Sequence, residues 1–220
     1  MNFKELTGRT NTHLISIEGN QFLHSESVSD FFQLKSNMHQ KGIDLKIASG
    51  FRSYERQRTI WNEKAEGKRT LRDPQGNPLN YHELNCDEIF QAILNWSSIP
   101  GTSRHHWGTD IDVYDYTYYR DGRRLRLAND EYSGTGPNAK LSAELYHQED
   151  LYFRPYLDGK SYQVELWHIS NTKVSEKILK LYTLDIFKKS IESDPLLKLK
   201  DKILANLVPL YKKYIALVTE

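Results

Sequence analysis

Two short segments contain histidines and carboxylates that could bind one metal ion. The first, SRHHWGTDID from Ser103 to Asp112, includes His105, and the second, ELWH, includes Glu165 and His168. Two imidazoles and one carboxylate suit zinc, and three protein ligands with an open fourth position are typical of a catalytic zinc site. The second carboxylate, Glu165, could take a proton from a water molecule at the metal. The two segments together predict a zinc hydrolase.

The spacing inside the first segment predicts how its two ligands meet. His105 and Asp112 are seven positions apart, with Gly108 between them. A turn at this glycine could bring His105 back over the strand that carries Asp112. Residues 109–113 alternate polar and apolar, as a strand with one buried face does. Asp110 shares a strand face with Asp112, so it is a candidate hydrogen-bond partner of a ligand or a substitute ligand.

The second segment lies in a stretch that predicts a strand over residues 162–169. In a regular strand, Glu165 and His168 would point to opposite faces because they are three positions apart. The base must nevertheless reach a water molecule at the metal. We therefore predict a bulge or bend at residues 166–167 that re-aims one of the two side chains.

Periodicity and end signals predict the remaining elements. Ser27 begins an S-x-x-D pattern that predicts a capping box and a helix to about Gln40, with Gly42 as its stop. Ser53 is the expected N-cap of a helix over residues 54–65. Further expected elements are strands near 14–17 and 45–47, helices over 86–96 and 141–148, and two amphipathic segments after Val174, separated at Asp194–Pro195, with Pro209 kinking or restarting the second.

These elements predict an α+β fold, in which a small antiparallel sheet carries the zinc site and helices pack on its other face. The chain has 220 residues, which suits one domain with an appendage. We expect residues 1–173 to form the catalytic domain. Residues 174–220 are the expected C-terminal helical extension, packed on that domain or appended to it.

The composition argues against several classes of protein. Lys and Arg total 30 against 29 Asp and Glu, so charge gives no case for a nucleic-acid or membrane partner. The single cysteine, Cys86, excludes an intrachain disulfide and a cysteine-based zinc site. No run approaches the ~20 apolar residues of a membrane span, and no signal peptide is visible. We expect a protein that is cytoplasmic, or exported after loss of a leader or by another route.

Three motifs in order form a family pattern. They are S-G-[FY]-R-S-x-x-x-Q at 49–57, S-x-H-x-x-G-x-x-x-D at 103–112 and E-x-W-H at 165–168. Over about residues 45–170 the chain resembles the VanY-like zinc D-alanyl-D-alanine carboxypeptidases, which are related to the vancomycin-resistance enzymes. Their superfamily includes lysostaphin-type peptidases and the signalling domain of Hedgehog proteins. The resemblance implies Zn²⁺ as cofactor and a peptidoglycan stem peptide or muropeptide as substrate.

The resemblance also implies a role for each matching residue. The zinc ligands would be His105, Asp112 and His168. Glu165 would be the general base and later the general acid. Arg52 would polarise the scissile carbonyl or hold the terminal carboxylate of the peptide, with Gln57 and Ser103 assisting. The expected reaction is zinc-dependent hydrolysis of D-alanine-containing peptidoglycan peptides.

Several functions fit these residues. Release of a terminal D-alanine, L,D-carboxypeptidase cleavage and endopeptidase cleavage of cross-bridges would use the same groups. A non-catalytic zinc-binding interaction module is the main alternative, but such a module need not keep Glu165. A non-haem iron oxygenase with two histidines and one carboxylate usually places its first two ligands as H-x-D. The offset of seven between His105 and Asp112 does not match that pattern.

Three features depart from the family's pattern, and one of them is the helical tail after Val174, which lies outside the resemblance. Asp110 adds an acid before the ligand Asp112, and residues 114–159 form a long charged segment that could remodel the substrate groove. Within that segment, the sequence RDGRRLR at 120–126 is typical of a solvated loop. Its functional alternative is to steer an acidic muropeptide toward the groove.

Overall fold

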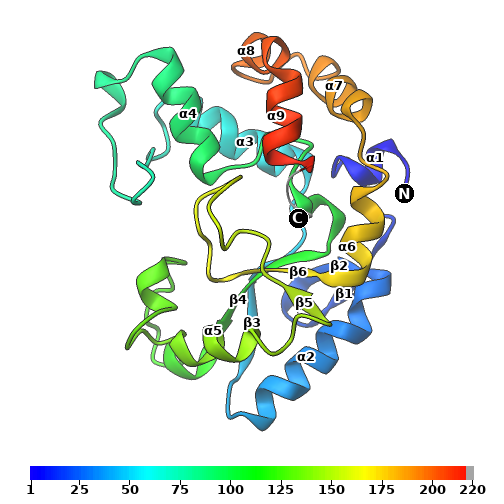
Figure 1. Ribbon diagram of the computed structural model, residues 1–220, viewed down its shortest axis with the longest axis vertical. Helices are drawn as coiled ribbons and strands as arrows, with labels where there is room; N and C mark the ends of the chain where they lie inside the picture. The colour runs from blue at the N-terminus through cyan, green and yellow to red at the C-terminus, as the bar shows by residue number, and fades with distance from the viewer. Residues whose placement is uncertain (217–220) are drawn as a thin grey trace.

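The computed structural model describes residues 1–216 and has an antiparallel four-stranded sheet at its centre (Figure 1). The strand order is β3 (Leu45–Ser49), β4 (Asp110–Asp115), β6 (His168–Asn171) and β5 (Tyr152–Phe153). In Figure 1, α2 (Val28–Gln40) and α5 (Ala139–Leu145) lie below this sheet, while α3 (Tyr54–Ala65) and α4 (Cys86–Trp96) lie above it. The predicted α+β class is confirmed.

The alternation of β4 divides the sheet into two chemically different faces. Ile111 and Val113 are fully buried in an apolar core with residues of α2 and α5. Asp110 and Asp112, which alternate with them, lie on the opposite face. The core on the first face also contains Phe31, Leu34, Met38, Leu141 and Leu145. Burial of this apolar face fixes the strand's register, because a slip of one residue would bury the two carboxylates in the core.

A second antiparallel pair forms a hairpin near the N-terminus. It consists of β1 (Leu14–Ile17) and β2 (Gln21–His24), and a short helix, α1 (Phe3–Leu6), precedes it. The backbone N–H of His24 donates to the carbonyl of Gly108 at 2.9 Å. The hairpin therefore supports the turn at Gly108, within the segment that carries His105 and Asp112.

Helix starts follow the expected cap residues, with one difference in mechanism. Ser53 accepts a hydrogen bond from the N–H of Arg56 and caps α3, as predicted. Ser27 stands at the N-cap position of α2, but its hydroxyl donates to the carbonyl of His24 instead. The predicted capping box at Ser27 is therefore wrong, because a preceding 3-10 turn already uses that hydroxyl.

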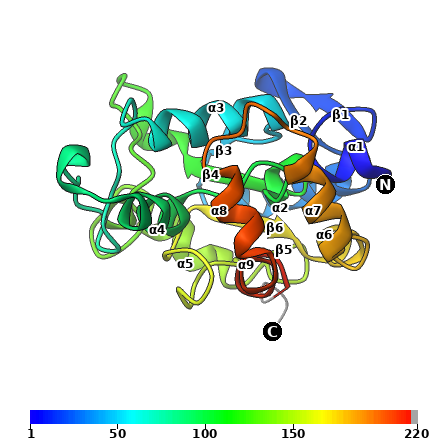
Figure 2. The same ribbon diagram turned by 90° about the horizontal axis from the view of Figure 1, so that it is seen from above.

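The C-terminal region contains four helices among the described residues, where the sequence predicted two amphipathic segments. They are α6 (Thr172–Leu179), α7 (Leu184–Glu192), α8 (Lys200–Ala205) and α9 (Leu207–Tyr214). Pro209 lies in the first turn of α9, which restarts after Asn206. The helices share one apolar core with α3 and α4, formed in part by Trp61, Ile93, Phe187, Ile191 and Ile203. Viewed from above, α8 and α9 lie beside α4, and α7 lies on their other side, next to α6 (Figure 2).

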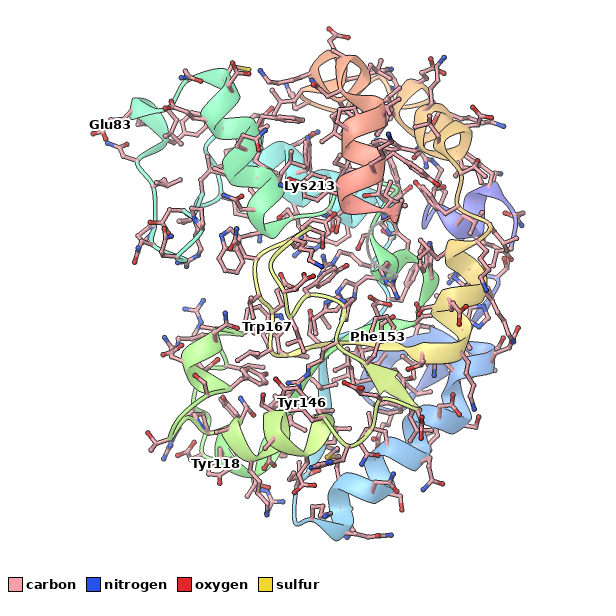
Figure 3. The ribbon with its side chains drawn as sticks, viewed as in Figure 1. Glu83, Tyr118, Tyr146, Phe153, Trp167 and Lys213 are labelled. Carbon is pink, nitrogen blue, oxygen red and sulfur yellow. The ribbon has the colours of Figure 1, made fainter. Side chains whose placement is uncertain are left out.

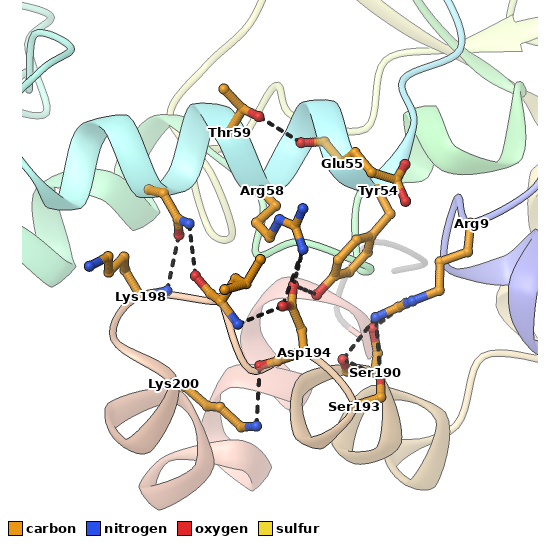
Figure 4. A network of polar contacts seen from close by, with 12 residues as sticks. Arg9, Tyr54, Glu55, Arg58, Thr59, Ser190, Ser193, Asp194, Lys198 and Lys200 are labelled. Carbon is orange, nitrogen blue, oxygen red and sulfur yellow. Dashed lines mark hydrogen bonds and ion pairs between the residues drawn. The ribbon is translucent and has the colours of Figure 1, made fainter.

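Asp194 joins this region to α3. Its carboxylate accepts from the hydroxyl of Tyr54 at 2.8 Å and from the guanidinium of Arg58 at 3.2 Å (Figure 4). The N–H of Leu196 completes the set at 2.9 Å. Asp194 is itself buried, so a charged group is held here by three donors.

Short 3-10 helices lie in five of the connections between the helices and strands of residues 1–216. They are η1 (Glu18–Asn20), η2 (Ser25–Ser27), η3 (Tyr81–Glu83), η4 (Arg104–Trp107), η5 (Tyr116–Tyr119) and η6 (Asn129–Glu131). Across residues 1–216, no helix has the length and apolar character needed to cross a membrane.

Candidate metal centre

Three separate elements supply the three candidate ligands. His105 comes from η4, Asp112 from β4 and His168 from the first position of β6. One donor atom from each residue lies within 4.8 Å of the other two, and all three side chains are buried. The sequence-predicted ligand residues therefore meet at one point on the polar face of the sheet.

The backbone explains why these residues meet. Asp112 pairs with His168 in the antiparallel register of β4 and β6, so their side chains stand side by side. The 3-10 helix η4 ends at Gly108, whose φ of 72° lies in the left-handed region. The N–H of Gly108 donates to the carbonyl of His105 at 3.3 Å. This is the turn expected from the spacing, and it returns His105 to the strand that carries Asp112.

One ring nitrogen of His105 is available to a metal. Its Nδ1 lies 2.9 Å from the carbonyl oxygen of Gly50, which can only accept, so this nitrogen carries the proton. Its Nε2 then has a free lone pair and points toward Asp112, 3.7 Å from Oδ2. Burial and the nearby charge of Arg52 lower the pKa of His105 to about 4. The ring is therefore neutral at pH 7, which is the form that binds metals.

His168 lies between two carboxylates. Its Nδ1 is 3.1 Å from Asp112 Oδ1, and its Nε2 is 2.8 Å from Asp110 Oδ2. Burial lowers the pKa of His168, but the two aspartates outweigh that effect and raise it to about 10. The electrostatic potential at this point therefore favours a positive charge. A divalent cation bound between His105, Asp112 and Nδ1 of His168 would meet that requirement, so the donor set fits zinc.

Asp110 supports His168 rather than joining the ligand group. Its carboxylate also accepts from Arg104 Nε at 3.1 Å and from the hydroxyl of Ser170 at 2.5 Å. Arg104 in turn donates to the hydroxyl of Ser170 at 2.6 Å. Burial acts to raise the pKa of Asp110, but Arg104 and His168 hold it well below its usual range. Asp110 thus remains charged and fixes the ring of His168 from the side away from Asp112.

Glu165 reaches the centre through a turn. The N–H of His168 donates to the carbonyl of Glu165 at 3.3 Å, and β6 begins only at His168. The predicted strand over 162–169 is therefore wrong, and a tight turn takes the place of the predicted distortion within a strand. As a result Glu165 Oε2 lies 3.5 Å from His168 Nδ1. Burial and Asp112 raise the pKa of Glu165 to about 7 against the opposing charge of His168.

Arg52 forms the opposite wall of the site. Its guanidinium donates to Gln57 Oε1 at 3.0 Å and to the hydroxyl of Ser49 at 3.3 Å. Gln57 is fully buried and donates in turn to the carbonyl of Ser98 at 2.7 Å. His106 is also fully buried, and its Nδ1 lies 2.6 Å from the carbonyl oxygen of Arg52. This histidine holds the backbone of Arg52 instead of facing solvent.

A cavity of about 90 Å³ lies over these groups. Arg52, Ser103, Glu165 and all three candidate ligands line it. Its remaining wall is formed by Trp96, Ser97, Ser98, Tyr156, Tyr162 and Trp167, and of these only Trp167 lies in one of the three motifs. Trp167 lies between the α4 side and the α5 side of the molecule (Figure 3). A larger cavity of about 700 Å³ beside β5 and α6, near Phe153, contains none of the candidate ligands.

Comparison with known proteins places this geometry in a family. The family profile for VanY, described as D-alanyl-D-alanine carboxypeptidase, matches residues 20–173. A protein of Haemophilus influenzae described as uncharacterised is 37% identical over 98 residues, which cover 43% of this chain and 67% of the relative. Another protein from the same organism, also described as uncharacterised, is 28% identical over 122 residues, which cover 53% of this chain and 92% of the relative.

Solved structures of low sequence identity share the fold. A vancomycin-resistance D,D-pentapeptidase VanY variant in complex with Zn(II) gives a TM-score of 0.53 at 20% identity, covering 75% of this chain and 82% of that one. VanYB in complex with D-alanine-D-alanine gives 0.55 at 16% identity, covering 83% and 91%. The LdcB LD-carboxypeptidase gives 0.50 at 17% identity, covering 92% and 78%. The family profile matches more than half of the residues of this chain, so the chain belongs to the VanY family of D-alanyl-D-alanine carboxypeptidases.

Proposed function

We propose that this protein is a zinc-dependent carboxypeptidase that hydrolyses D-alanine-containing peptides of peptidoglycan. The observation that carries the proposal is the meeting of three donor atoms within 4.8 Å, with the carboxylate of Glu165 3.5 Å from one of them. Membership of the VanY family indicates a peptidoglycan-related peptidase. Two neighbours in fold are described as complexes with Zn(II) and with D-alanine-D-alanine, which supports the cofactor and the substrate class.

In this proposal, His105, Asp112 and His168 hold zinc, which when bound would make a water molecule more acidic and polarise the scissile carbonyl. Glu165 takes the proton of the attacking water and later gives it to the leaving amine. Its carboxylate is 3.5 Å from Nδ1 of His168, within reach of a water molecule held at the candidate ligands. The turn at 165–168 places the carboxylate on the same side as Nδ1 of His168.

Arg52 serves the substrate from the opposite wall. Its guanidinium stabilises negative charge on the carbonyl oxygen, or binds the terminal carboxylate of the peptide. Gln57 fixes the direction of the guanidinium by accepting a hydrogen bond from one of its N–H groups. Ser103 lines the same cavity. A positive charge held in place before the reaction needs little rearrangement when the carbonyl oxygen becomes an anion.

Release of the terminal residue of a D-Ala-D-Ala peptide is the leading specificity. L,D-carboxypeptidase activity is the second candidate, supported by similarity in fold to the LdcB LD-carboxypeptidase. Endopeptidase cleavage of cross-bridges would use the same groups. A zinc-binding module without activity would have no use for the buried carboxylate of Glu165 beside the ligands.

The deciding experiment uses zinc-loaded protein and a muropeptide ending in D-Ala-D-Ala, with a tetrapeptide stem and a cross-linked dimer in parallel. Mass spectrometry follows the loss of one alanine, and Glu165→Ala is the control. Loss of alanine that depends on Glu165 supports the carboxypeptidase. Cleavage of the tetrapeptide or dimer alone would replace the leading specificity. Stoichiometric zinc without hydrolysis of any of the three would overturn the enzymatic function.

A further inference from the structure

The inner face of α3 carries a lysine toward the small cavity. Gln57, Trp61 and Lys64 are spaced by four and three positions, so they share one side of the helix. Gln57 and Trp61 are fully buried. Lys64 lies in the last turn, and long helical side chains lean toward the helix N-terminus. Its amine therefore extends back along the helix toward Arg52 and Gln57.

The contacts of Lys64 place its charge at the edge of the site. Its Nζ donates to the hydroxyl of Ser97 at 2.6 Å, and Ser97 lines the cavity beside Glu165. The neighbouring Ser98 accepts from Gln57, which holds Arg52. Two adjacent serines thus connect the two cations of this wall, Arg52 and Lys64.

Lys64 is a partly buried cation that has no carboxylate partner among residues 1–216. Within residues 1–216, no ion pair shorter than 4.0 Å involves its amine. Burial, with Arg69 and Arg52 acting in the same direction, lowers its pKa to about 8, while Glu165 opposes the shift. A desolvated charge is costly unless it is paired. An anionic group that enters the cavity would provide the missing partner.

We propose that Lys64 binds the terminal carboxylate of the substrate, which leaves Arg52 to hold the oxygen of the scissile carbonyl. This inference rests on the proposed function and specifies its substrate class as peptides with a free chain end. Arg52 lines the small cavity together with His105 and Asp112, whereas Lys64 reaches only Ser97 at its edge, so Arg52 is the cation nearer the candidate ligands. The terminal carboxylate is about one residue, ~3.8 Å between Cα atoms, beyond the scissile bond. A cross-bridge made through the side-chain amine of a lysine has no carboxylate at that position.

The test separates binding from cleavage by using zinc-loaded Glu165→Ala protein. Isothermal titration calorimetry compares a pentapeptide stem ending in D-Ala-D-Ala with the same peptide ending in a carboxamide. We expect the acid to bind at least about 10-fold more tightly than the amide, because the amide cannot form the charge-assisted hydrogen bond to Lys64. Adding Lys64→Met should abolish that difference, and Lys64→Arg should retain part of it. Lys68→Met, at an exposed lysine paired with Glu66, is the matched control and should retain all of it.

Each other outcome contradicts the inference. A preference for the acid that survives Lys64→Met would overturn it. Equal binding of acid and amide by the Glu165→Ala protein, or no binding of either peptide by that protein, would also overturn it. Circular dichroism and zinc content show that each variant is folded and loaded. Failure of the proposed function looks different: acid binding would depend on Lys64, yet the protein with Glu165 restored would not cleave the peptide.

Discussion

The carboxylate of Asp110 lies 2.8 Å from Nε2 of His168, while Asp112 lies 3.1 Å from the other nitrogen of the same ring. The position of the ring is therefore fixed from both sides. Because antiparallel pairing sets Asp110 opposite Ser170 and Asp112 opposite His168, one strand supplies both the candidate ligand and the group that orients its neighbour. A carboxylate behind a metal-binding histidine raises the basicity of the ligand and fixes its tautomer.

Replacing Asp110 should therefore weaken zinc binding without removing a ligand. Asp110→Asn keeps the size of the side chain but removes the charge, and we expect zinc affinity to fall by about 10–100-fold. Competition with a chromophoric chelator measures it. Ser170→Ala keeps the carboxylate and removes the hydroxyl that donates to it and accepts from Arg104, so it should have a smaller effect. Unchanged affinity in Asp110→Asn would show that the contact to His168 does not support the metal.

Replacing Glu165 should separate catalysis from metal binding. Glu165 is outside the group of three donor residues, so Glu165→Gln should bind zinc as the unmodified protein does. Its kcat on the D-Ala-D-Ala muropeptide should fall by about 10²–10⁴-fold, because a positioned base contributes roughly that factor. Glu149→Gln, at an exposed glutamate before β5, is the control and should leave kcat unchanged. A Glu165→Gln enzyme of normal kcat would assign the base to another group.

The ligand set could be predicted from the sequence because its information is local. His105, Gly108 and Asp112 lie within eight residues, and the alternation of β4 shows which of its side chains avoid the apolar core. Their convergence with His168 follows from a single strand pairing.

The errors and omissions concern contacts between distant segments. Residues 162–169 have the composition of a strand, but only His168 onward pairs with β4, and the preceding residues turn to bring in Glu165. Lys64 was missed because its partner, Ser97, is 33 positions away and no spacing pattern connects them. The turn before His168 and the contact of Lys64 with Ser97 both depend on how the helices pack around the two apolar cores, which the sequence alone does not show.

The turn at Gly108 provides a test of how the first histidine motif is held. A Cβ at this position would lie 2.7 Å from the backbone nitrogen of His24, and φ is 72°. Gly108→Ala should therefore lower stability by more than the roughly 1–2 kcal/mol that a left-handed conformation costs an alanine. It should also weaken zinc binding by displacing His105. Thermal unfolding and chelator competition measure the two effects.

Gly122 offers a matched control for that substitution. It also has a positive φ, 83°, but a Cβ there would meet no atom within 4 Å. Gly122→Ala should show the conformational cost alone and leave zinc affinity unchanged. Equal loss of stability in the two variants would mean that the contact between the hairpin and Gly108 does not constrain the turn.

Asp194 should anchor the C-terminal helices to α3. Asp194→Asn removes the charge that pairs with Arg58 while keeping a similar shape. Breaking a buried ion pair from one side is strongly destabilising, and we expect a loss of roughly 3 kcal/mol at pH 7. For a chain of this size that corresponds to a fall in Tm of about 6–12 °C. Asp150→Asn, at an exposed aspartate, is the control for loss of a charge elsewhere.

The same contribution should depend on pH with a definite sign. Burial acts to raise the pKa of Asp194, but hydrogen bonds from Tyr54, Leu196 and Arg58 outweigh it and hold the pKa below its usual value. The unfolded chain therefore binds this proton more readily than the folded protein. The stabilisation is fully present above the unfolded pKa of about 3.9 and is lost as the pH falls through the lower, folded value. Urea unfolding from pH 7 to pH 2 should show the full difference between the two proteins above pH ~5 and a difference that shrinks as the pH falls toward the folded pKa. A constant difference would assign the effect to shape rather than to the charge of Asp194.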